Sequence, residues 1–200
     1  MKVKALVTVL VVVFAMALML GCAKVPQQEL DAAKAALDAA KAAEADRYVP
    51  ELFNAAKDSL TAATAEIEKQ NSKFALFRSF KRAKDLIAKV TTGANDAVAQ
   101  AAVKKEEVKK EAEGILAQIT PAIENVKKLM KKAPRGKEGR AALEAINSDL
   151  AAVEASVAEV NTAMTNGDFL TARDKAQANL QKLNSLAEEL QAAINKKLGK

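Results

Sequence analysis

The sequence contains no histidine, no tryptophan and only one cysteine. Histidine is the commonest general base and metal ligand near neutral pH, and a cysteine thiolate is the commonest sulfur nucleophile. A single cysteine also excludes a disulfide within the chain. The sequence therefore predicts no catalytic residue, no metal site and no cofactor, and we expect a protein that is not an enzyme.

Aromatic residues make up only 4% of the chain, and there are only four prolines and seven glycines. The apolar residues are mainly alanine, with 44 copies, followed by leucine, valine and isoleucine. Alanine is the strongest helix former because its side chain loses no conformational entropy in a helix. This composition predicts an all-α protein of long, closely packed helices rather than one with a thick globular core.

The N-terminus has the pattern of a secretion signal. Lys2 and Lys4 precede an unbroken apolar run over residues 5–20. A signal has an apolar core of about 7–15 residues, whereas a membrane-spanning helix needs about 20. The run ends at Gly21-Cys22, which resembles the lipobox read by the lipoprotein signal peptidase. We predict that residues 1–21 are removed and that Cys22 carries the lipid; the alternative is an uncleaved anchor with an incidental cysteine.

The residues around the cleavage site refine this prediction. Met19 and Leu20 depart from the usual lipobox, but Gly21-Cys22 is intact. Ala23 permits transfer to the outer membrane under the enteric sorting rule, so we expect the protein on the periplasmic face of the outer membrane. Its first partner is then the membrane, through the N-terminal lipid. Export makes nucleic acid a poor partner, although the net charge is +6.

Apolar residues recur at intervals of three and four through most of the remaining chain, which indicates helices that bury one face. After a short tether of residues 22–26, we expect a first helical region over residues 27–119 and a second, a helical hairpin, over residues 120–200. The expected helix ends are Val49-Pro50, Asn71-Ser72, a break or kink at Thr120-Pro121, a loop at 134–139, and Asn166-Gly167-Asp168.

The spacing also assigns buried faces. The helix after Pro26 is expected to run to Tyr48 with Glu44 on its buried face, and the buried face of the helix after Asn71-Ser72 is expected to begin at Leu76. Strict spacing from Leu143 to Met164 implies coiled-coil packing, and short turns imply antiparallel neighbours. We therefore predict an elongated antiparallel helical bundle built from coiled-coil hairpins.

Two turn sequences resemble one another. Asn71-Ser72-Lys73-Phe74 and Asn166-Gly167-Asp168-Phe169 are separated by the same number of residues as Arg78 and Arg173. Either the chain contains an internal duplication, or two helical hairpins have converged on the same turn residues.

Residues 22–26, and the segment Ala45-Asp46-Arg47-Tyr48-Val49-Pro50-Glu51-Leu52-Phe53-Asn54-Ala55-Ala56, resemble a family of bacterial envelope lipoproteins. That family is catalogued only as a domain of unknown function and is sometimes followed by an OmpA-like domain. Its pattern is an Ala-rich helix, an Ala-Pro-Glu-Leu-Tyr-like junction and further helices, with Val49 and Phe53 as departures here. The resemblance covers residues 22 to 105 and implies an Ala-rich helical fold, but no catalytic residue or ligand.

A second candidate site is a basic stretch near residue 130. Its members are Lys127, Lys128, Lys131, Lys132, Arg135, Lys137 and Arg140, opposed by Glu138 alone. Such a stretch is either a solvated end of a bundle, where lysine favours helix C-termini, or a surface that contacts anionic headgroups or a polyanion.

These features predict a non-enzymatic lipoprotein of the cell envelope that acts as a helical spacer or interaction module. One alternative is a module that binds a small apolar or lipid-like ligand between alanine-lined helices. Another is a link between membrane and peptidoglycan, with Lys200 as the attachment point. The chain ends Lys196-Lys197-Leu198-Gly199-Lys200, and it resembles in outline lipoproteins whose C-terminal lysine is joined to peptidoglycan. The expected partners are accordingly peptidoglycan or another envelope protein.

Overall fold

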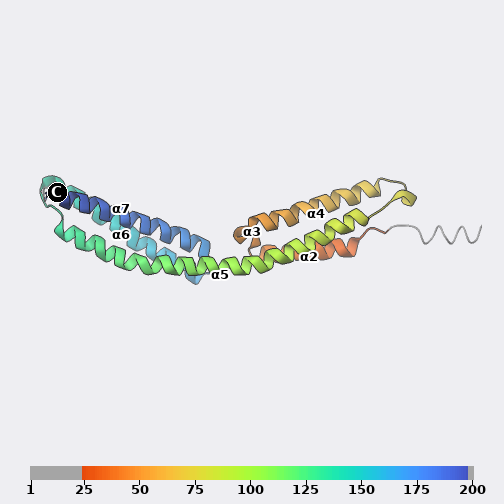
Figure 1. The fold of residues 1–200 in the computed structure, drawn as a ribbon, viewed down its shortest axis with the longest axis horizontal. Coiled ribbons are helices and arrows are strands. Elements are labelled where there is room, and N and C mark those ends of the chain that lie inside the picture. The colour runs from red at the N-terminus through yellow and green to blue at the C-terminus, as the bar shows by residue number, and fades with distance from the viewer. Residues whose placement is uncertain (1–23, 198–200) are drawn as a thin grey trace, which may run out of the picture. The chain divides into compact units, whose positions relative to one another are not determined.

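The computed structural model describes residues 24–197, with Lys137 and Glu138 described by their backbone only. Figure 1 shows that this part of the chain is helical, which confirms the predicted all-α class. The elements are α2 (Gln27–Ala42), α3 (Ala45–Tyr48), α4 (Pro50–Asn71), the 3-10 turn η1 (Ala75–Phe77), α5 (Lys81–Lys132), α6 (Lys137–Thr165) and α7 (Phe169–Lys197). The chain forms two compact units that divide between Lys104 and Lys105, so α5 contributes to both.

In the first unit, α2, α4 and the first part of α5 share one apolar core. Its buried residues are Leu30, Ala33, Ala63, Ile67, Phe80, Ala83, Ile87 and Val90. Ala33, Ala63 and Ala83 are fully buried, one from each helix. Small side chains at such contacts allow helix axes to approach near the lower end of the usual 8–10 Å. The predicted alanine-rich contacts are therefore present.

The prediction of one helix from residue 27 to Tyr48 with Glu44 on its buried face was wrong. α2 ends at Ala42, and Glu44 adopts a left-handed backbone conformation with φ of 59° before α3 begins. This conformation costs an ordinary residue roughly 1–2 kcal/mol. In return, Ala45 and Tyr48 become the buried residues, and the Glu44 carboxylate accepts a 2.8 Å hydrogen bond from Arg47 Nη1. The break keeps a charge out of the core.

The connection from α4 to α5 also differs from the prediction. Leu76 lies in η1 with 54% of its surface exposed, so it does not begin the buried face of the next helix. Ser72 donates its hydroxyl to the Lys69 carbonyl of α4, 2.9 Å away, and so does not cap α5. The Arg78 guanidinium donates to the carbonyls of Asn71 and Lys73 at 2.9 Å. These bonds satisfy one carbonyl of the last residue of α4 and one in the loop that follows it.

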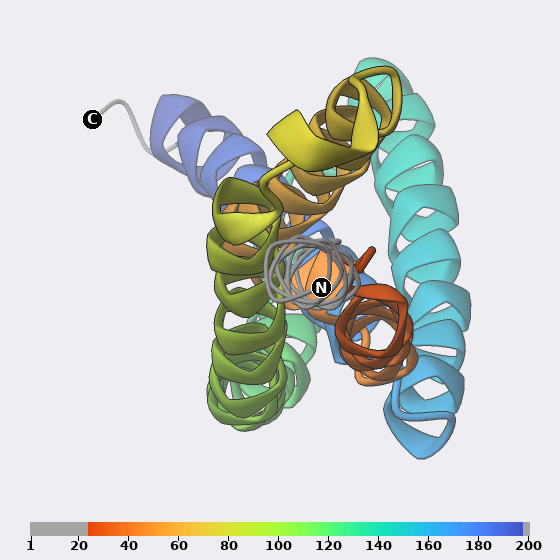
Figure 2. The same ribbon diagram turned by 90° about the vertical axis from the view of Figure 1, so that its right-hand side faces the viewer.

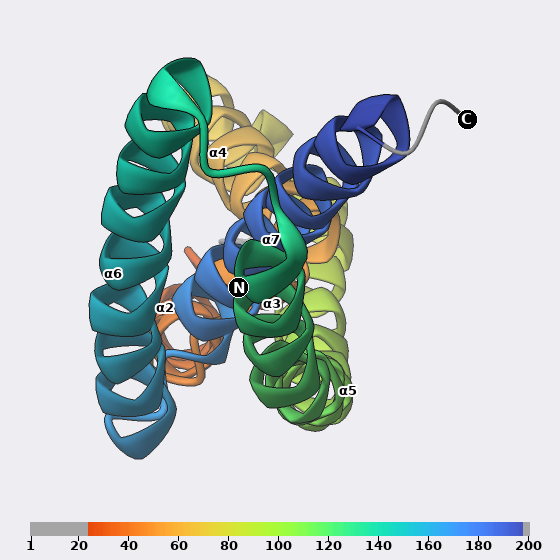
Figure 3. The same cartoon turned by 90° about the vertical axis from the view of Figure 1, so that its left-hand side faces the viewer.

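In the second unit, the later part of α5 packs with α6 and α7 around a larger core. Its buried residues are Ala112, Ile119, Val126, Ala133, Ile146, Leu150, Val153, Val160, Ala172, Ala176, Leu183, Leu186, Leu190 and Ile194. Ion pairs join Asp149 to Lys182 at 2.7 Å and Glu159 to Lys175, as expected for antiparallel neighbours. Figure 3 faces the end of this unit where α5 passes into α6 and α7 ends.

α5 does not end at Thr120-Pro121, where the sequence predicted a break or kink. A proline inside a helix removes a hydrogen bond and crowds an earlier carbonyl, at a cost of about 3 kcal/mol. Ile119 and Val126 on either side of it are 1% and 0% exposed, whereas Pro121 itself is exposed. Ending the helix there would uncover the core, and this packing keeps the helix continuous. The boundary drawn from the sequence after residue 119 therefore falls inside α5.

The predicted stop and start at Asn166-Gly167-Asp168 is confirmed. Gly167 has a φ of 76°, and its N–H donates to the Met164 carbonyl at 3.1 Å. The Asp168 N–H donates to the Ala163 carbonyl at 2.9 Å, which completes a Schellman motif. The Asp168 carboxylate accepts the Thr171 N–H at 3.5 Å, at the start of α7. Glycine suits this turn because the left-handed conformation carries no side-chain penalty.

A pair of glycine substitutions tests the close approach between the α5–α6 loop and α6. A Cβ on Gly139 would lie 2.3 Å from the Pro134 carbonyl oxygen, whereas one on Gly114 would meet nothing within 4 Å. We expect Gly139→Ala to lower the free energy of unfolding by about 1–3 kcal/mol through overpacking. Gly114→Ala should raise it by about 0.5–1 kcal/mol, because alanine favours a helix interior. Denaturant titration gives both values, and equal effects would contradict the close contact.

Two polar residues, Gln70 and Asn179, are 6% and 7% exposed. The Gln70 amide donates to Glu66 Oε1 at 2.6 Å and accepts from the Ser79 N–H at 3.1 Å. The hydrogen bond that Gln70 donates to Glu66 is the main reason why the pKa of Glu66 is lowered. Asn179 Nδ2 has no hydrogen-bond partner within the described residues. One buried amide is thus satisfied, whereas the Nδ2 group of the other has no partner within the described residues.

The two buried amides predict opposite responses to leucine. Asn179→Leu should stabilise the protein, because leaving a buried donor unsatisfied costs about 1–3 kcal/mol. Gln70→Leu should destabilise it by about 0.5–1.5 kcal/mol per lost hydrogen bond. The midpoints of thermal unfolding of both variants, measured by circular dichroism, check the signs. A lower midpoint for Asn179→Leu would show that its amide has a partner.

Candidate functional site

The predicted lipidation and attachment residues lie outside the described part of the chain. Gly21 and Cys22 precede the first described residue, Lys24, and Lys200 follows the end of α7 at Lys197. Their predicted roles stay predictions. Of the candidate sites predicted from the sequence, the basic stretch of the second unit lies within the described residues.

The basic residues lie on the last turns of α5, in the loop that follows and at the start of α6. Lys127, Lys128, Lys131, Lys132, Arg135 and Arg140 are exposed, and Lys137 is described only by its backbone. Lys127, Lys131 and Arg135 line one groove between α5 and α6. Lys128 and Lys132 each follow a groove residue by one position, about 100° further around the helix. The structure therefore divides the stretch into two faces.

We call the first face the basic groove, lined by Lys127, Met130, Lys131, Arg135, Leu143, Asn147 and Leu150, with a volume of about 370 Å³. Leu150 is 3% exposed, so the floor of the groove is the core itself. Lys127 Nζ is 2.7 Å from Glu154 Oε1, which neutralises that end. Lys131 and Arg135 form no ion pair within the described residues, and they place two positive charges beside the apolar floor of the groove.

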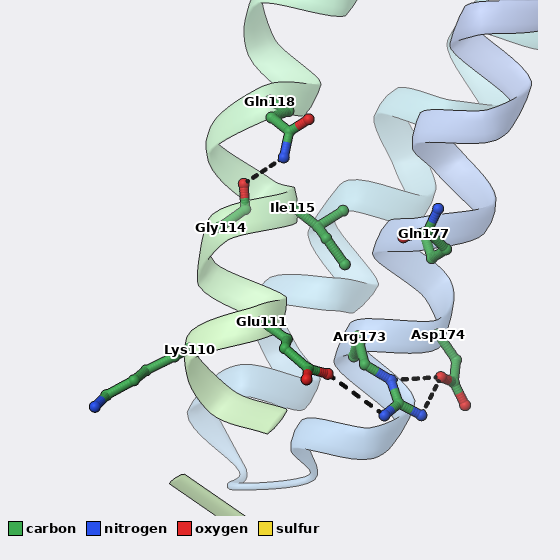
Figure 4. A pocket seen from close by; sticks show the side chains of 8 residues that line it. All are labelled: Lys110, Glu111, Gly114, Ile115, Gln118, Arg173, Asp174 and Gln177. Atoms are coloured by element: carbon green, nitrogen blue, oxygen red, sulfur yellow. Dashed lines mark hydrogen bonds and ion pairs between the residues drawn. The ribbon is translucent and has the colours of Figure 1, made fainter. Parts of the chain in front are cut away.

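A second groove lies between α5 and α7 (Figure 4), with a volume of about 510 Å³. Its lining residues are Lys110, Glu111, Gly114, Ile115, Gln118, Arg173, Asp174 and Gln177. Arg173 Nε and Nη2 donate to Asp174 Oδ1 at 2.9 and 2.8 Å, and Nη1 lies 3.7 Å from Glu111 Oε2. The hydrogen bond to Asp174 is the main cause that raises the pKa of Arg173. An external anion would have to displace these carboxylates from Arg173. The ion pair between Arg173 and Glu111 therefore serves to join α5 and α7 rather than to bind a ligand.

A third hollow bears on the alternative of a small apolar ligand. It is lined mainly by apolar side chains, among them Leu143, Ile146 and Leu190, and its volume is about 50 Å³. Pockets that hold small molecules usually measure about 300–1,000 Å³. A lipid-like ligand would therefore require the helices around this hollow to separate.

Within the described residues there is no cluster of three or more acidic or cysteine side chains that could hold a metal ion. In the same part of the chain, no helix combines the length and apolarity needed to span a membrane.

One exposed apolar surface is not predicted by the spacing of apolar residues in the sequence. Phe74, Leu76 and Phe77 are 69%, 54% and 76% exposed in the loop between α4 and α5. Leu76 had been assigned to a buried helix face because it lies four residues before Phe80. Three large apolar residues occur within four positions of the sequence, and one face of a helix cannot bury all three. This density could have indicated that some of them are exposed.

No family model matches this chain, and no curated protein or solved structure matches it either. The resemblance of residues 22 to 105 to an envelope lipoprotein family accordingly stays a prediction.

The basic groove predicts a position-dependent response to charge removal. We expect the double variant Lys131→Gln/Arg135→Gln to bind a soluble polyanion such as dextran sulfate less tightly, by about 1 kcal/mol or roughly fivefold for each cation lost. Lys128→Gln/Lys132→Gln removes the same charge from the neighbouring face and should have a smaller effect. Isothermal titration at low and high salt measures both. Equal losses would show that binding depends on net charge and not on the groove.

Proposed function

We propose that this protein is a non-enzymatic lipoprotein of the cell envelope, anchored by a lipid on Cys22, whose helical units serve as an interaction module. One observation carries the proposal: the apolar run of residues 5–20 ends at Gly21-Cys22, and the folded part begins at Gln27. The five residues from Cys22 to Gln27 span at most about 17 Å when extended. A lipid on Cys22 would therefore hold the first unit against the membrane surface.

The anchor itself is physically sufficient. Each methylene buried in the bilayer contributes about 0.8 kcal/mol, and one acyl chain alone binds only marginally. A lipoprotein cysteine carries two or three chains, so dissociation would be slow. No helix of the folded part is needed to keep the protein at the membrane.

The basic groove supports a role in interaction. Its two cations, Lys131 and Arg135, beside an apolar floor suit an anionic partner with some apolar surface, such as a segment of an envelope protein or an anionic envelope polymer. The composition supports a role without catalysis, since histidine is absent and the only cysteine is the proposed lipid site. A helical spacer that presents this groove is the function that these features favour best.

Mass spectrometry of the N-terminus tests the anchor. The chain purified from bacterial membranes should begin at Cys22 and carry the mass of a diacylglycerol, with or without a third acyl chain. Cys22→Ser should abolish both the processing and the added mass, and it serves as the control. A chain that begins at Met1, or an unmodified Cys22 in the membrane fraction, would contradict the proposal.

A further inference from the structure

The loop between α4 and α5 presents a small apolar surface, which we call the apolar tip and define as Phe74, Leu76 and Phe77. All three side chains are more than half exposed. The two phenyl rings have centroids 6.4 Å apart and are tilted by 50°, so they form one patch. Large exposed apolar side chains grouped in this way mark a contact surface.

The apolar tip is held in place by hydrogen bonds from polar groups on either side of it. The Phe77 N–H donates to the Phe74 carbonyl at 2.9 Å and closes η1. Arg78 donates to two loop carbonyls, and Gln70 in α4 accepts the Ser79 N–H. The apolar side chains are thus presented by a backbone that is already ordered, which lowers the entropy cost of inserting them into a partner.

The surroundings of the apolar tip are positively charged. Residues 69–84 contain six lysines and arginines and no acidic residue. Lys73 and Lys81 flank the apolar tip and are exposed, and Arg82 follows them on α5. An apolar centre with cations around it complements an anionic lipid surface, where side chains such as Phe and Leu enter the acyl boundary and Lys and Arg meet headgroups.

The apolar tip also lies at the end of the first unit where the folded chain begins. Val25 packs against the core cluster that contains Ile67, near the end of α4, and Phe80, just before α5. Glu29 in the first turn of α2 pairs with Lys84 in the first turn of α5 at 2.9 Å. In Figure 1 the start of α2 and the α4–α5 loop lie at the same end of this unit, and Figure 2 faces that end. Cys22 is three residues before Val25, so a lipid there would be tethered to the end of the unit that carries the apolar tip.

We propose that the apolar tip inserts into the interface of an anionic lipid bilayer and forms a second membrane contact next to the lipid on Cys22. The choice of membrane rests on the proposed function, whereas the exposed patch and its cations do not. A tether of a few residues keeps the apolar tip at high effective concentration near the bilayer, so a weak contact is enough. A lipid alone permits the first unit to rotate about its tether, and the second contact would fix its orientation.

The absence of tryptophan provides a direct test. The full chain carrying Phe77→Trp, purified from membranes, is reconstituted in phosphatidylethanolamine–phosphatidylglycerol vesicles with brominated acyl chains. We expect a blue shift of its fluorescence and loss of emission through bromine quenching. Val103→Trp is the matched control, because Val103 is 61% exposed and lies about 33 Å along α5 from Lys81. Its emission should be unshifted and unquenched.

Each outcome bears on the proposal. Quenching that Leu76→Ser diminishes in the Phe77→Trp chain supports it. Equal quenching at both tryptophan positions, or a blue shift without bromine quenching, overturns it; the latter would indicate a protein partner or a second copy of the chain. The mass of Cys22 in the same sample is read separately. An acylated Cys22 without quenching would contradict only the proposed membrane contact of the apolar tip. Quenching with an unmodified Cys22 would contradict only the proposed lipid anchor.

Discussion

Close contact across alanine is the constraint on which each helical unit depends. Ala33, Ala63 and Ala83 lie in the core of the first unit, and Ala112, Ala172 and Ala176 lie in the core of the second, all fully buried. Short side chains bring helices together but bury little area each, so stability depends on many contacts along long helices. They also leave no wide space between helices. The hollows of these units are consequently open grooves or a small void, and chemically distinct surfaces lie at loops and helix ends.

Periodicity was enough to predict those parts of the fold in which sequence and packing agree. The strict spacing from Leu143 to Met164 became α6, and Gly167 made its turn readable because only glycine adopts a left-handed conformation without cost. Periodicity did not predict the helix break at Glu44 or the continuous helix at Pro121. In both places the local preference conflicts with burial, and the side chains that decide the outcome, Tyr48 in one case and Val126 in the other, are several residues away.

The two similar turn sequences show the same limit. Asn166 is followed by glycine, and the chain closes a Schellman motif there. Asn71 is followed by serine and keeps negative φ, and its carbonyl is taken instead by Arg78. Arg173, at the matching position, lies inside α7 and pairs with Asp174 of the same helix and with Glu111 of α5. The sequence identified the residues of the basic stretch, but it did not predict that they divide into two faces. That division depends on where α6 packs against α5 and on the pairing of Lys127 with Glu154.

If Cys22 carries a lipid and the apolar tip meets the same bilayer, the two contacts would do different physical work. The acyl chains would supply nearly all the binding free energy, but a single point of attachment would not by itself fix the orientation of the first unit. The apolar tip would add little free energy, yet it would give the first unit a second point of contact on a loop whose backbone is held by Gln70 and Arg78. A contact that needs no strength of its own can consist of a few residues on a loop, and its loss would leave the protein at the membrane. What would be lost is the fixed direction in which α4 and the start of α5 leave the surface, and for a spacer that direction is the property that matters.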